Sequence, residues 1–251
     1  MEKEIREAQG PDAVLLFANG ACGNICPVDA MSGEARQGVG EEWMEMMGRK
    51  IARRALGGFD TGRDAGKERL AVARGTIEIP LRDVPDDTVR RARRFLEENE
   101  NREFALPRLS DYGTETGAAR ESVVSLEEFL ATPYWKKQEA KEIVALAGEG
   151  NRPPEKCGIT AVGVGDTAMV MLPFELFVEL GLEIRERSPF RNTMVVELAN
   201  GWSGYVPTLR AFSREGGYET RTLRSSKLVP EAGGMVVDEA CRLLKDIRNG
   251  G

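Results

Sequence analysis

The sequence predicts an α/β protein, with an α+β arrangement as the alternative, in which helices flank a mixed β-sheet. Short apolar runs typical of strands alternate with longer amphipathic segments typical of helices. A Gly-Asp turn separates two apolar runs, 158–164 and 167–172, and predicts a β-hairpin. With 41% apolar residues and 28 glycines in 251 residues, the composition is that of a globular protein.

The first part of the chain is expected to open with a charged helical segment and a core strand. Ala13–Ala18 is wholly apolar and bounded by turn residues, which predicts a fully buried strand. The elements expected next are a glycine-rich loop over 19–40, a helix from Glu41 to about Gly57, a half-exposed strand over Leu70–Leu81, a charged helix over Asp86–Arg102, a polar loop or lid over 104–121, and a helix from a capping box at Ser125 to about Leu146, interrupted at Pro133.

The second part is expected to hold most of the sheet. After the hairpin come a helix from Glu175 to about Arg187, a strand over Thr193–Ala199, a glycine- and tyrosine-rich loop, and a closing amphipathic helix over about Glu231–Ile247. Asn151–Pro154 is typical of a linker. We therefore expect one domain over 1–251, with 150–156 as the place where a sub-boundary would fall.

Charge and composition exclude several classes of partner. There are 35 Lys and Arg against 41 Asp and Glu, a formal net charge of −6 with no basic stripe, so we expect no nucleic-acid partner. The longest apolar runs are far shorter than the ~20 residues that span a bilayer. The N-terminal segment has no apolar region of a secretion signal, and the compartment stays undetermined. Four cysteines are too few for a disulfide scaffold and are expected to be buried, reduced thiols.

The sequence contains no histidine. This excludes Ser-His-Asp and Cys-His catalytic arrangements, the HExxH zinc helix and histidine-ligated metal sites that this chain could build alone. Any such chemistry would need imidazoles from another polypeptide.

Three loops that leave expected strands carry unusual residues, and sites of α/β proteins collect in such loops. The first is FANGACGNICPVD, Phe17–Asp29. Its glycines, Gly23 among them, would let backbone N–H groups converge into an anion-binding nest or oxyanion hole, with Asn24 or Cys26 at the centre. A long turn that only reverses the chain explains the same residues equally well.

The second loop, Met171–Phe177, places Glu175 two residues after a proline that ends a strand. We expect Glu175 in the first turn of the next helix, where the helix dipole favours its charge. The third is ANGWSGYVPT with the downstream GGYET, which holds Trp202, Gly204, Tyr205 and Tyr218. Helix capping and aromatic turn packing are the structural alternatives for these two loops.

In their order and spacing, the three loops resemble the catalytic domain of neutral, non-lysosomal ceramidases, which are zinc-dependent amidases that cleave the N-acyl bond of ceramides. FANGACGNICPVD resembles that family's strand and Gly-Asp-(Val/Ile)-(Ser/Asn)-Pro loop, LPFELFVELG its Pro-Gly-Glu helix start, and ANGWSGYVPT with GGYET its Asn-x-Tyr-x-x-Tyr loop with a downstream Tyr-Glu. The resemblance covers Ala13 to about Gly57 and Cys157 to about Leu244.

The resemblance implies a role for each matched position. Glu175 and Tyr205 match the glutamate and tyrosine ligands of zinc, and Tyr218 matches a tyrosine beside the substrate amide. Cys26 stands where the family has its catalytic serine, and Asn24 is its expected companion in catalysis. The expected substrate-binding positions are Gly23, Trp202, where the family often has tyrosine, and Gly204.

In the family, the two histidine ligands lie upstream of the first loop, in an N-terminal half that this chain lacks. The resemblance therefore implies an incomplete ceramidase-type domain, truncated or split, whose zinc site an upstream polypeptide would complete. Two oxygen ligands alone would hold zinc weakly. The implied reaction is attack of a zinc-activated water on a lipid or other N-acyl amide, with Tyr218 and loop N–H groups stabilising the oxyanion.

Two other functions stay open. The chain could be a non-catalytic half-domain that serves as a binding or assembly module, or a thiol enzyme that uses Cys26. We further expect that the Ala13–Ala18 edge, as the interior of a domain cut open, exposes apolar surface and drives self-association.

Overall fold

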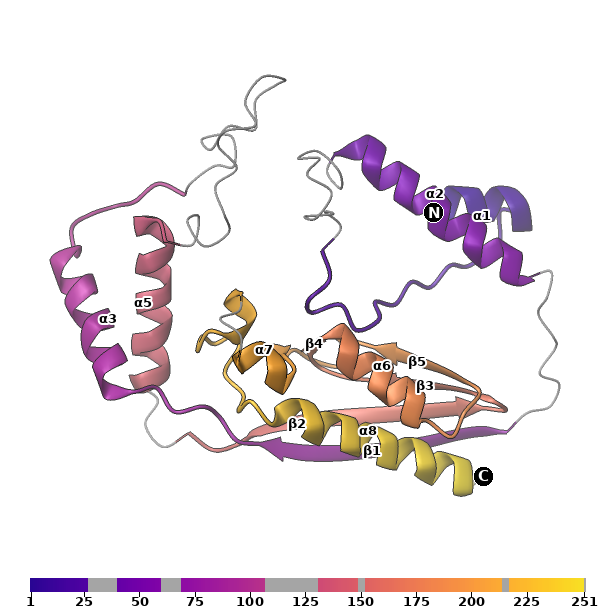
Figure 1. Cartoon of the computed structure of the whole chain (residues 1–251). Coiled ribbons are helices and arrows are strands. Elements are labelled where there is room, and N and C mark those ends of the chain that lie inside the picture. Colours follow the sequence, from indigo (N-terminus) through magenta and orange to yellow (C-terminus); the bar gives the residue numbers. More distant parts are fainter. Residues whose placement is uncertain (27–39, 60–68, 107–130, 149–151, 214–216, 251) are drawn as a thin grey trace.

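A computed structural model of the chain describes residues 1–26, 40–59, 69–106, 131–148, 152–213 and 217–250. Its centre is a four-stranded sheet in the order β1-β2-β3-β5 (Figure 1). The strands are β1 (Leu70–Ile79), β2 (Glu155–Val164), β3 (Thr167–Met171) and β5 (Asn192–Val196). The β1–β2 and β2–β3 pairs are antiparallel, whereas β3–β5 is parallel. The mixed sheet with flanking helices confirms the predicted α/β class.

Two helices cover one face of this sheet. The closing helix α8 (Ala232–Asn249) packs on β1, β2 and β3, and α6 (Val178–Arg187) packs on β5 and on α8. Inward-facing Ile159, Ala161 and Val170 alternate with more exposed neighbours along their strands. They meet a stripe on α8 that includes Val236 and Leu244, so the core lies between the sheet and these two helices.

A second, two-stranded parallel sheet pairs β4 (Glu175–Leu176) with β6 (Tyr205–Val206). This corrects the expectation that Glu175 lies in the first turn of a helix. The N–H of Glu175 donates to the carbonyl of Gly204 at 3.0 Å, so residue 175 pairs with a neighbouring segment, and α6 begins only at Val178. Short helices follow β6, α7 over Leu209–Ser213 and a 3₁₀ turn, η2, over Tyr218–Thr220.

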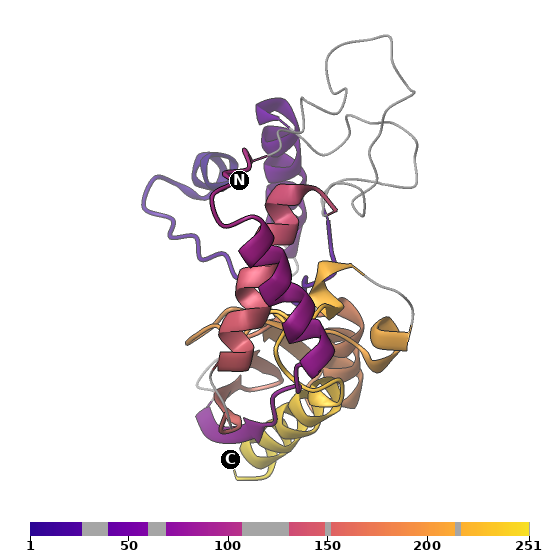
Figure 2. The ribbon, with the colours of Figure 1, turned by 90° about the vertical axis from the view of Figure 1, so that its left-hand side faces the viewer.

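Outside this core, the described residues include two further pairs of packed helices. Helices α1 (Glu2–Gln9) and α2 (Glu41–Phe59) pack on each other, as do α3 (Asp86–Glu98) and α5 (Pro133–Gly148), which lie side by side in Figure 2. Helix α5 begins at Pro133 rather than being interrupted there, because the first turn of a helix needs no N–H from that residue. The Ser125 capping box and most of the 104–121 loop lie outside the described residues.

Residues 13–18 do not form the buried strand predicted for them. The segment is extended without strand pairing, and Val14, Leu16 and Phe17 are 83%, 90% and 63% exposed. Among the described residues, no strand lies alongside to accept the backbone hydrogen bonds of this segment. An apolar run indicates that a segment favours burial. A strand also needs a second segment to pair with, and that partner is set by the tertiary fold.

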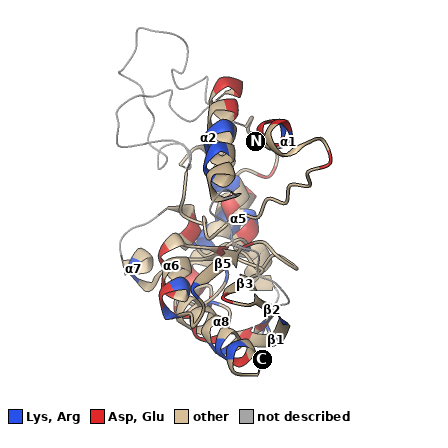
Figure 3. Ribbon diagram, turned by 90° about the vertical axis from the view of Figure 1, so that its right-hand side faces the viewer, with Lys and Arg blue, Asp and Glu red and all other residues tan. Residues whose placement is uncertain are grey.

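Positive and negative side chains alternate over the helices instead of gathering on one element (Figure 3). Arg187 pairs with Glu183 and with Asp238 of α8, at 2.9 and 2.7 Å, and Arg242 pairs with Glu239 at 2.7 Å. Such exposed pairs stabilise a fold only slightly. Within the described ranges, none of the helices is long and apolar enough to cross a membrane.

Candidate functional site

Glu175 and Tyr205 are direct register partners in the β4–β6 pair. The Tyr205 hydroxyl donates a hydrogen bond to the Glu175 carboxylate and lies 3.3 Å from the hydroxyl of Tyr218. On its other side, the Glu175 carboxylate accepts a 2.7 Å hydrogen bond from the indole Nε1–H of Trp202. The structure thus brings together four of the residues singled out in the sequence, from the second and third loops.

Within this cluster, the phenol of Tyr205 is held in its protonated form. Burial raises the pKa of Tyr205 well above its usual range, and the hydrogen bonds to Glu175 and Tyr218 and the nearby Glu175 charge raise it further. The rings of Tyr205 and Tyr218 meet edge to face, with centroids 5.5 Å apart. A cation that used Tyr205 as a ligand would have to displace this proton.

The first loop is bound tightly to the backbone beside Glu175. The N–H of Gly23 donates to the carbonyl of Leu176 at 2.8 Å. A Cβ at position 23 would lie 2.5 Å from the carbonyl oxygen of Glu175, so only glycine allows this approach. Gly23, an expected substrate-binding position, therefore contacts the main chain of the cluster.

Asn24 contacts the start of α6. Its Oδ1 accepts a 2.8 Å hydrogen bond from the N–H of Val178, the first residue of the helix, and its Nδ2 donates to Glu179 at 2.8 Å. This is the contact of an N-terminal helix cap supplied from a distant loop. Cys26 is exposed at the end of the described segment and is not part of the Glu175 cluster.

Three backbone N–H groups of the first loop donate hydrogen bonds inside the protein. Those of Cys22, Gly23 and Ile25 donate to the Glu197 carboxylate, the Leu176 carbonyl and the Cys22 carbonyl. Groups that already donate cannot also stabilise an oxyanion. Of these three groups, the Cys22 N–H alone binds a carboxylate. The expectation that the cysteines are all buried fails, because Cys26 is exposed.

That carboxylate, Glu197, is the residue that the sequence analysis missed. It is 5% exposed and accepts from the Cys22 N–H at 3.0 Å, the Leu176 N–H at 3.2 Å and the Cys22 thiol at 2.7 Å. Burial, followed by the hydrogen bond and charge of Glu197, raises the pKa of Cys22 to about 11. Glu197 therefore ties the first loop to the second from the start of the third. A glutamate at the end of an apolar run, MVVEL, was the available signal.

Gly204 holds the third loop against the chain that precedes α8. Its φ is +90°, and a Cβ there would lie 2.4 Å from the carbonyl oxygen of Ser225. The next N–H, of Tyr205, donates to that same carbonyl at 2.7 Å. The close approach and the left-handed backbone both require glycine, and they fix the direction in which Tyr205 leaves the strand.

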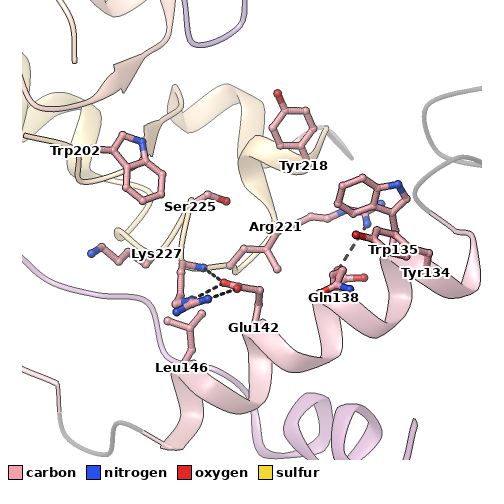
Figure 4. Close-up of a pocket in the computed structure, with 13 residues that line it drawn as sticks. Tyr134, Trp135, Gln138, Glu142, Leu146, Trp202, Tyr218, Arg221, Ser225 and Lys227 are labelled. Carbon is pink, nitrogen blue, oxygen red and sulfur yellow. Dashed lines mark hydrogen bonds and ion pairs between the residues drawn. The ribbon is translucent and has the colours of Figure 1, made fainter. Parts of the chain in front are cut away.

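A pocket of about 790 Å³ opens beside the cluster, between α5 and the segment 218–227 (Figure 4). In Figure 4, Gln138 and Glu142 of α5 face Trp202 and Tyr218 across it. Trp202 and Tyr218 contact the Glu175–Tyr205 pair and also line the pocket, so the two features are continuous. The contribution of α5 to the site had no signal in the sequence.

The donor set for a metal ion is incomplete. Over the ranges that the structure describes, no group of three or more Cys, Asp or Glu side chains is placed to hold a metal ion, and the sequence has no histidine. At the cluster, Glu175 and Tyr205 offer one carboxylate and one phenol oxygen. Both are ligand types that zinc accepts, but a catalytic zinc site uses three protein ligands.

Comparison with known proteins gives matches among solved structures only. No family model matches the chain, and no curated protein matches it. A crystal structure of neutral ceramidase from Pseudomonas aeruginosa matches 94% of this chain and 38% of its own, with 17% identity and a TM-score of 0.49. A structure described as ceramidase complexed with C2 matches 40% of this chain and 16% of its own, with 19% identity and a TM-score of 0.35.

Both of these solved structures are described as ceramidases. The chain spans 38% of the longer match, well under two thirds of that protein's length.

Proposed function

We propose that the chain is part of a ceramidase-like hydrolase that cleaves a linear N-acyl amide, and that it supplies half of a zinc site. The observation that carries the proposal is the convergence of Glu175 and Tyr205, register partners whose side chains share a hydrogen bond. These are the positions that the loop resemblance assigns as ligands. The nitrogen ligands would come from an upstream segment or a second polypeptide, because these 251 residues include no histidine.

In this proposal each residue of the cluster has a separate task. Glu175 and Tyr205 would hold zinc, which when bound activates a water molecule for attack on an amide carbonyl. Trp202 orients the Glu175 carboxylate through its indole N–H, at 2.7 Å. The Tyr218 hydroxyl lies 3.3 Å from that of Tyr205, and in this proposal it would donate to the carbonyl oxygen of a bound amide.

Glu197 holds in place the backbone next to Glu175. Because its carboxylate binds the N–H of Leu176, the residue after Glu175, it fixes the backbone from which the proposed ligand extends. It also fixes Cys22, whose neighbour Gly23 packs on the Glu175 carbonyl. Precise placement of ligands by such supporting contacts is typical of metal sites.

Reconstitution tests the proposal. The chain is co-expressed with the polypeptide encoded immediately upstream of Met1, and hydrolysis of a fluorescent short-chain ceramide and of an N-acyl aminocoumarin is measured. Zinc-dependent hydrolysis that a chelator abolishes, and that Glu175→Ala and Tyr205→Phe each remove, is the expected result. Glu239→Ala, which removes a carboxylate of α8 that is paired with Arg242, is the matched control. Hydrolysis that survives Glu175→Ala would refute the proposal.

A non-catalytic binding or assembly module is the second candidate, and one observation favours it. Asn24, Gly23 and Glu197 make contacts that serve the fold, a helix cap, a backbone approach and a buried carboxylate. A chain that kept these loops only for folding would need the same residues. A stable complex with the upstream polypeptide that lacks zinc and hydrolytic activity would support this function instead.

The third candidate function, a thiol enzyme, lacks a group that would activate its cysteine nucleophile among the described residues. Cys22 is kept as a thiol, since its pKa is raised to about 11, and Cys26 is outside the cluster. Thiol alkylation that abolished hydrolysis while chelation left it intact would favour this third function.

A further inference from the structure

We propose that the pocket between α5 and the segment 218–227 binds a hydroxyl-rich ring of the carbohydrate class, not a hydrocarbon chain. The pocket is well within the size range of small-molecule sites, at about 790 Å³. Two features of its wall carry the inference: an exposed tryptophan whose indole is hydrogen-bonded to Glu175, and ion-paired side chains from α5 and from 218–227.

The aromatic part of the wall comes from three separate segments. Tyr134 and Trp135 of α5 lie edge to face, with centroids 5.2 Å apart and planes at 90°. Trp202 and Tyr218 stand on the other side (Figure 4). The Trp202 ring is 55% exposed, yet its orientation is fixed by the indole hydrogen bond to Glu175. A large exposed ring held in one orientation is a stacking surface for a flat ligand with an apolar face, as pyranose rings have.

The polar part of the wall is made of ion pairs. Arg224 binds Glu142 through Nε and Nη2 at 2.8 and 2.5 Å, and Arg221 lies 3.6 Å from Glu139. The charges are paired, so the wall does not demand an ionic ligand. Guanidinium and carboxylate groups keep further donors and acceptors beyond those used in a pair, and hydroxyls can serve both.

A hydrocarbon chain would find apolar contacts at Leu146, Leu223 and the aromatic rings, but no hydrogen-bonding partner for the ion pairs of the wall. It would cover the Arg224–Glu142 and Arg221–Glu139 pairs and remove their contact with water, while offering no hydrogen bond in return. An isolated anion is also disfavoured, because each arginine already faces a carboxylate. A ligand with many hydroxyls satisfies the pairs and stacks on the rings at the same time.

The position of the pocket also indicates how such a ligand would be used. Trp202 and Tyr218 belong both to the pocket and to the Glu175–Tyr205 cluster, so a ring stacked there would lie next to the cluster. That the ligand is the substrate, an N-acylated amino sugar or a similar hydroxylated N-acyl amide, rests on the proposed function. Binding of such a ring by the pocket is independent of the proposed function.

The experiment measures binding to the full chain in metal-free buffer. Saturation-transfer NMR titrations use N-acetylglucosamine, methyl β-glucoside and N-octylacetamide, an apolar amide without hydroxyls. We expect transfer to the ring protons of both sugars and none to the octyl chain. Arg221→Ala should weaken sugar binding about fivefold, the loss of one hydrogen-bond donor. Arg242→Ala, which removes a paired arginine on α8, should leave sugar binding unchanged.

Tighter binding of N-octylacetamide than of the sugars, or no sugar binding by the folded chain, would overturn the inference. So would equal sugar binding by wild type and by both Arg221→Ala and Trp202→Leu. Because no zinc and no second polypeptide take part, sugar binding without reconstituted hydrolysis would leave this inference standing and count against the proposed function. Hydrolysis confined to long-chain ceramides, without sugar binding, would do the reverse.

Discussion

Zinc affinity distinguishes most clearly between a site with two ligand side chains and a complete zinc site. We expect the purified chain to bind zinc no more tightly than its Glu175→Ala variant does, within about threefold at pH 7. The physical reason is that the cluster offers only two of the proposed ligand side chains, and one of them, Tyr205, carries a proton. Three protein ligands are the minimum for a catalytic zinc.

The free-energy cost of using Tyr205 as a zinc ligand follows from the pKa of its phenol. Removing a proton from an ordinary tyrosine at pH 7 costs about 4 kcal/mol, since its pKa is about 10 and each unit is worth about 1.4 kcal/mol. The pKa of Tyr205 is raised further by burial and by its hydrogen bond to Glu175, so the cost in the folded chain is larger. At neutral pH Tyr205 therefore contributes little to zinc binding, and the pair offers zinc no more than one side chain.

Isothermal titration calorimetry of metal-free protein at pH 7 measures this directly. Wild type, Glu175→Ala and Tyr205→Phe are compared, with Glu239→Ala as the control for loss of a carboxylate elsewhere. Similar weak isotherms are expected for all four. Tight, one-to-one zinc uptake by the wild type that disappears in Glu175→Ala would show that the described residues omit a ligand and would refute the reasoning.

Four further outcomes follow from the structure. Replacing the buried carboxylate in Glu197→Ala should lower the free energy of unfolding by about 1–3 kcal/mol in urea titrations, because two N–H groups lose their acceptor, and an unchanged midpoint would contradict it. Asn24→Ala should cost about 1 kcal/mol in the same assay by removing the α6 cap. Cys22 should react with iodoacetamide far more slowly than Cys26 at pH 8, as read by mass spectrometry, because its pKa is raised to about 11. The stability that the Cys22 thiol contributes is present below pH 9 and is lost as the pH rises towards about 11, because the thiol ionises first in the unfolded chain. Leu16→Asp should reduce self-association in light scattering, and a wild type that stays monomeric at high concentration would refute the role assigned to this exposed segment.

Local patterns in the sequence were enough for the elements that depend on local periodicity. The hairpin with its Gly165-Asp166 turn, the alternating strand from Leu70 and the closing amphipathic helix are all found where they were predicted, within a few residues. Each carries its own signal, a turn dipeptide or a repeat of two or 3.6 residues. The α/β class follows from their order.

The elements that need a distant neighbour were predicted poorly. The run from Ala13 has the composition of a strand but no strand beside it among the described residues, and Glu175 lies in a strand because Gly204 accepts its N–H. The buried carboxylate of Glu197 and the pocket wall from α5 are also contacts across long sequence separations. No local pattern encodes them.

The sequence alone therefore determined the side-chain chemistry of these 251 residues: no imidazole, a carboxylate and a phenol in motifs that resemble those of ceramidases, and a loop rich in glycine. Only the tertiary structure decided which of these groups meet. It placed Glu175 beside Tyr205, bound the first loop to Glu197 and set aromatic rings and ion-paired side chains around one pocket. The physical reason is that residue types fix donors, acceptors and charge, whereas their distances depend on the packing of segments far apart in the chain.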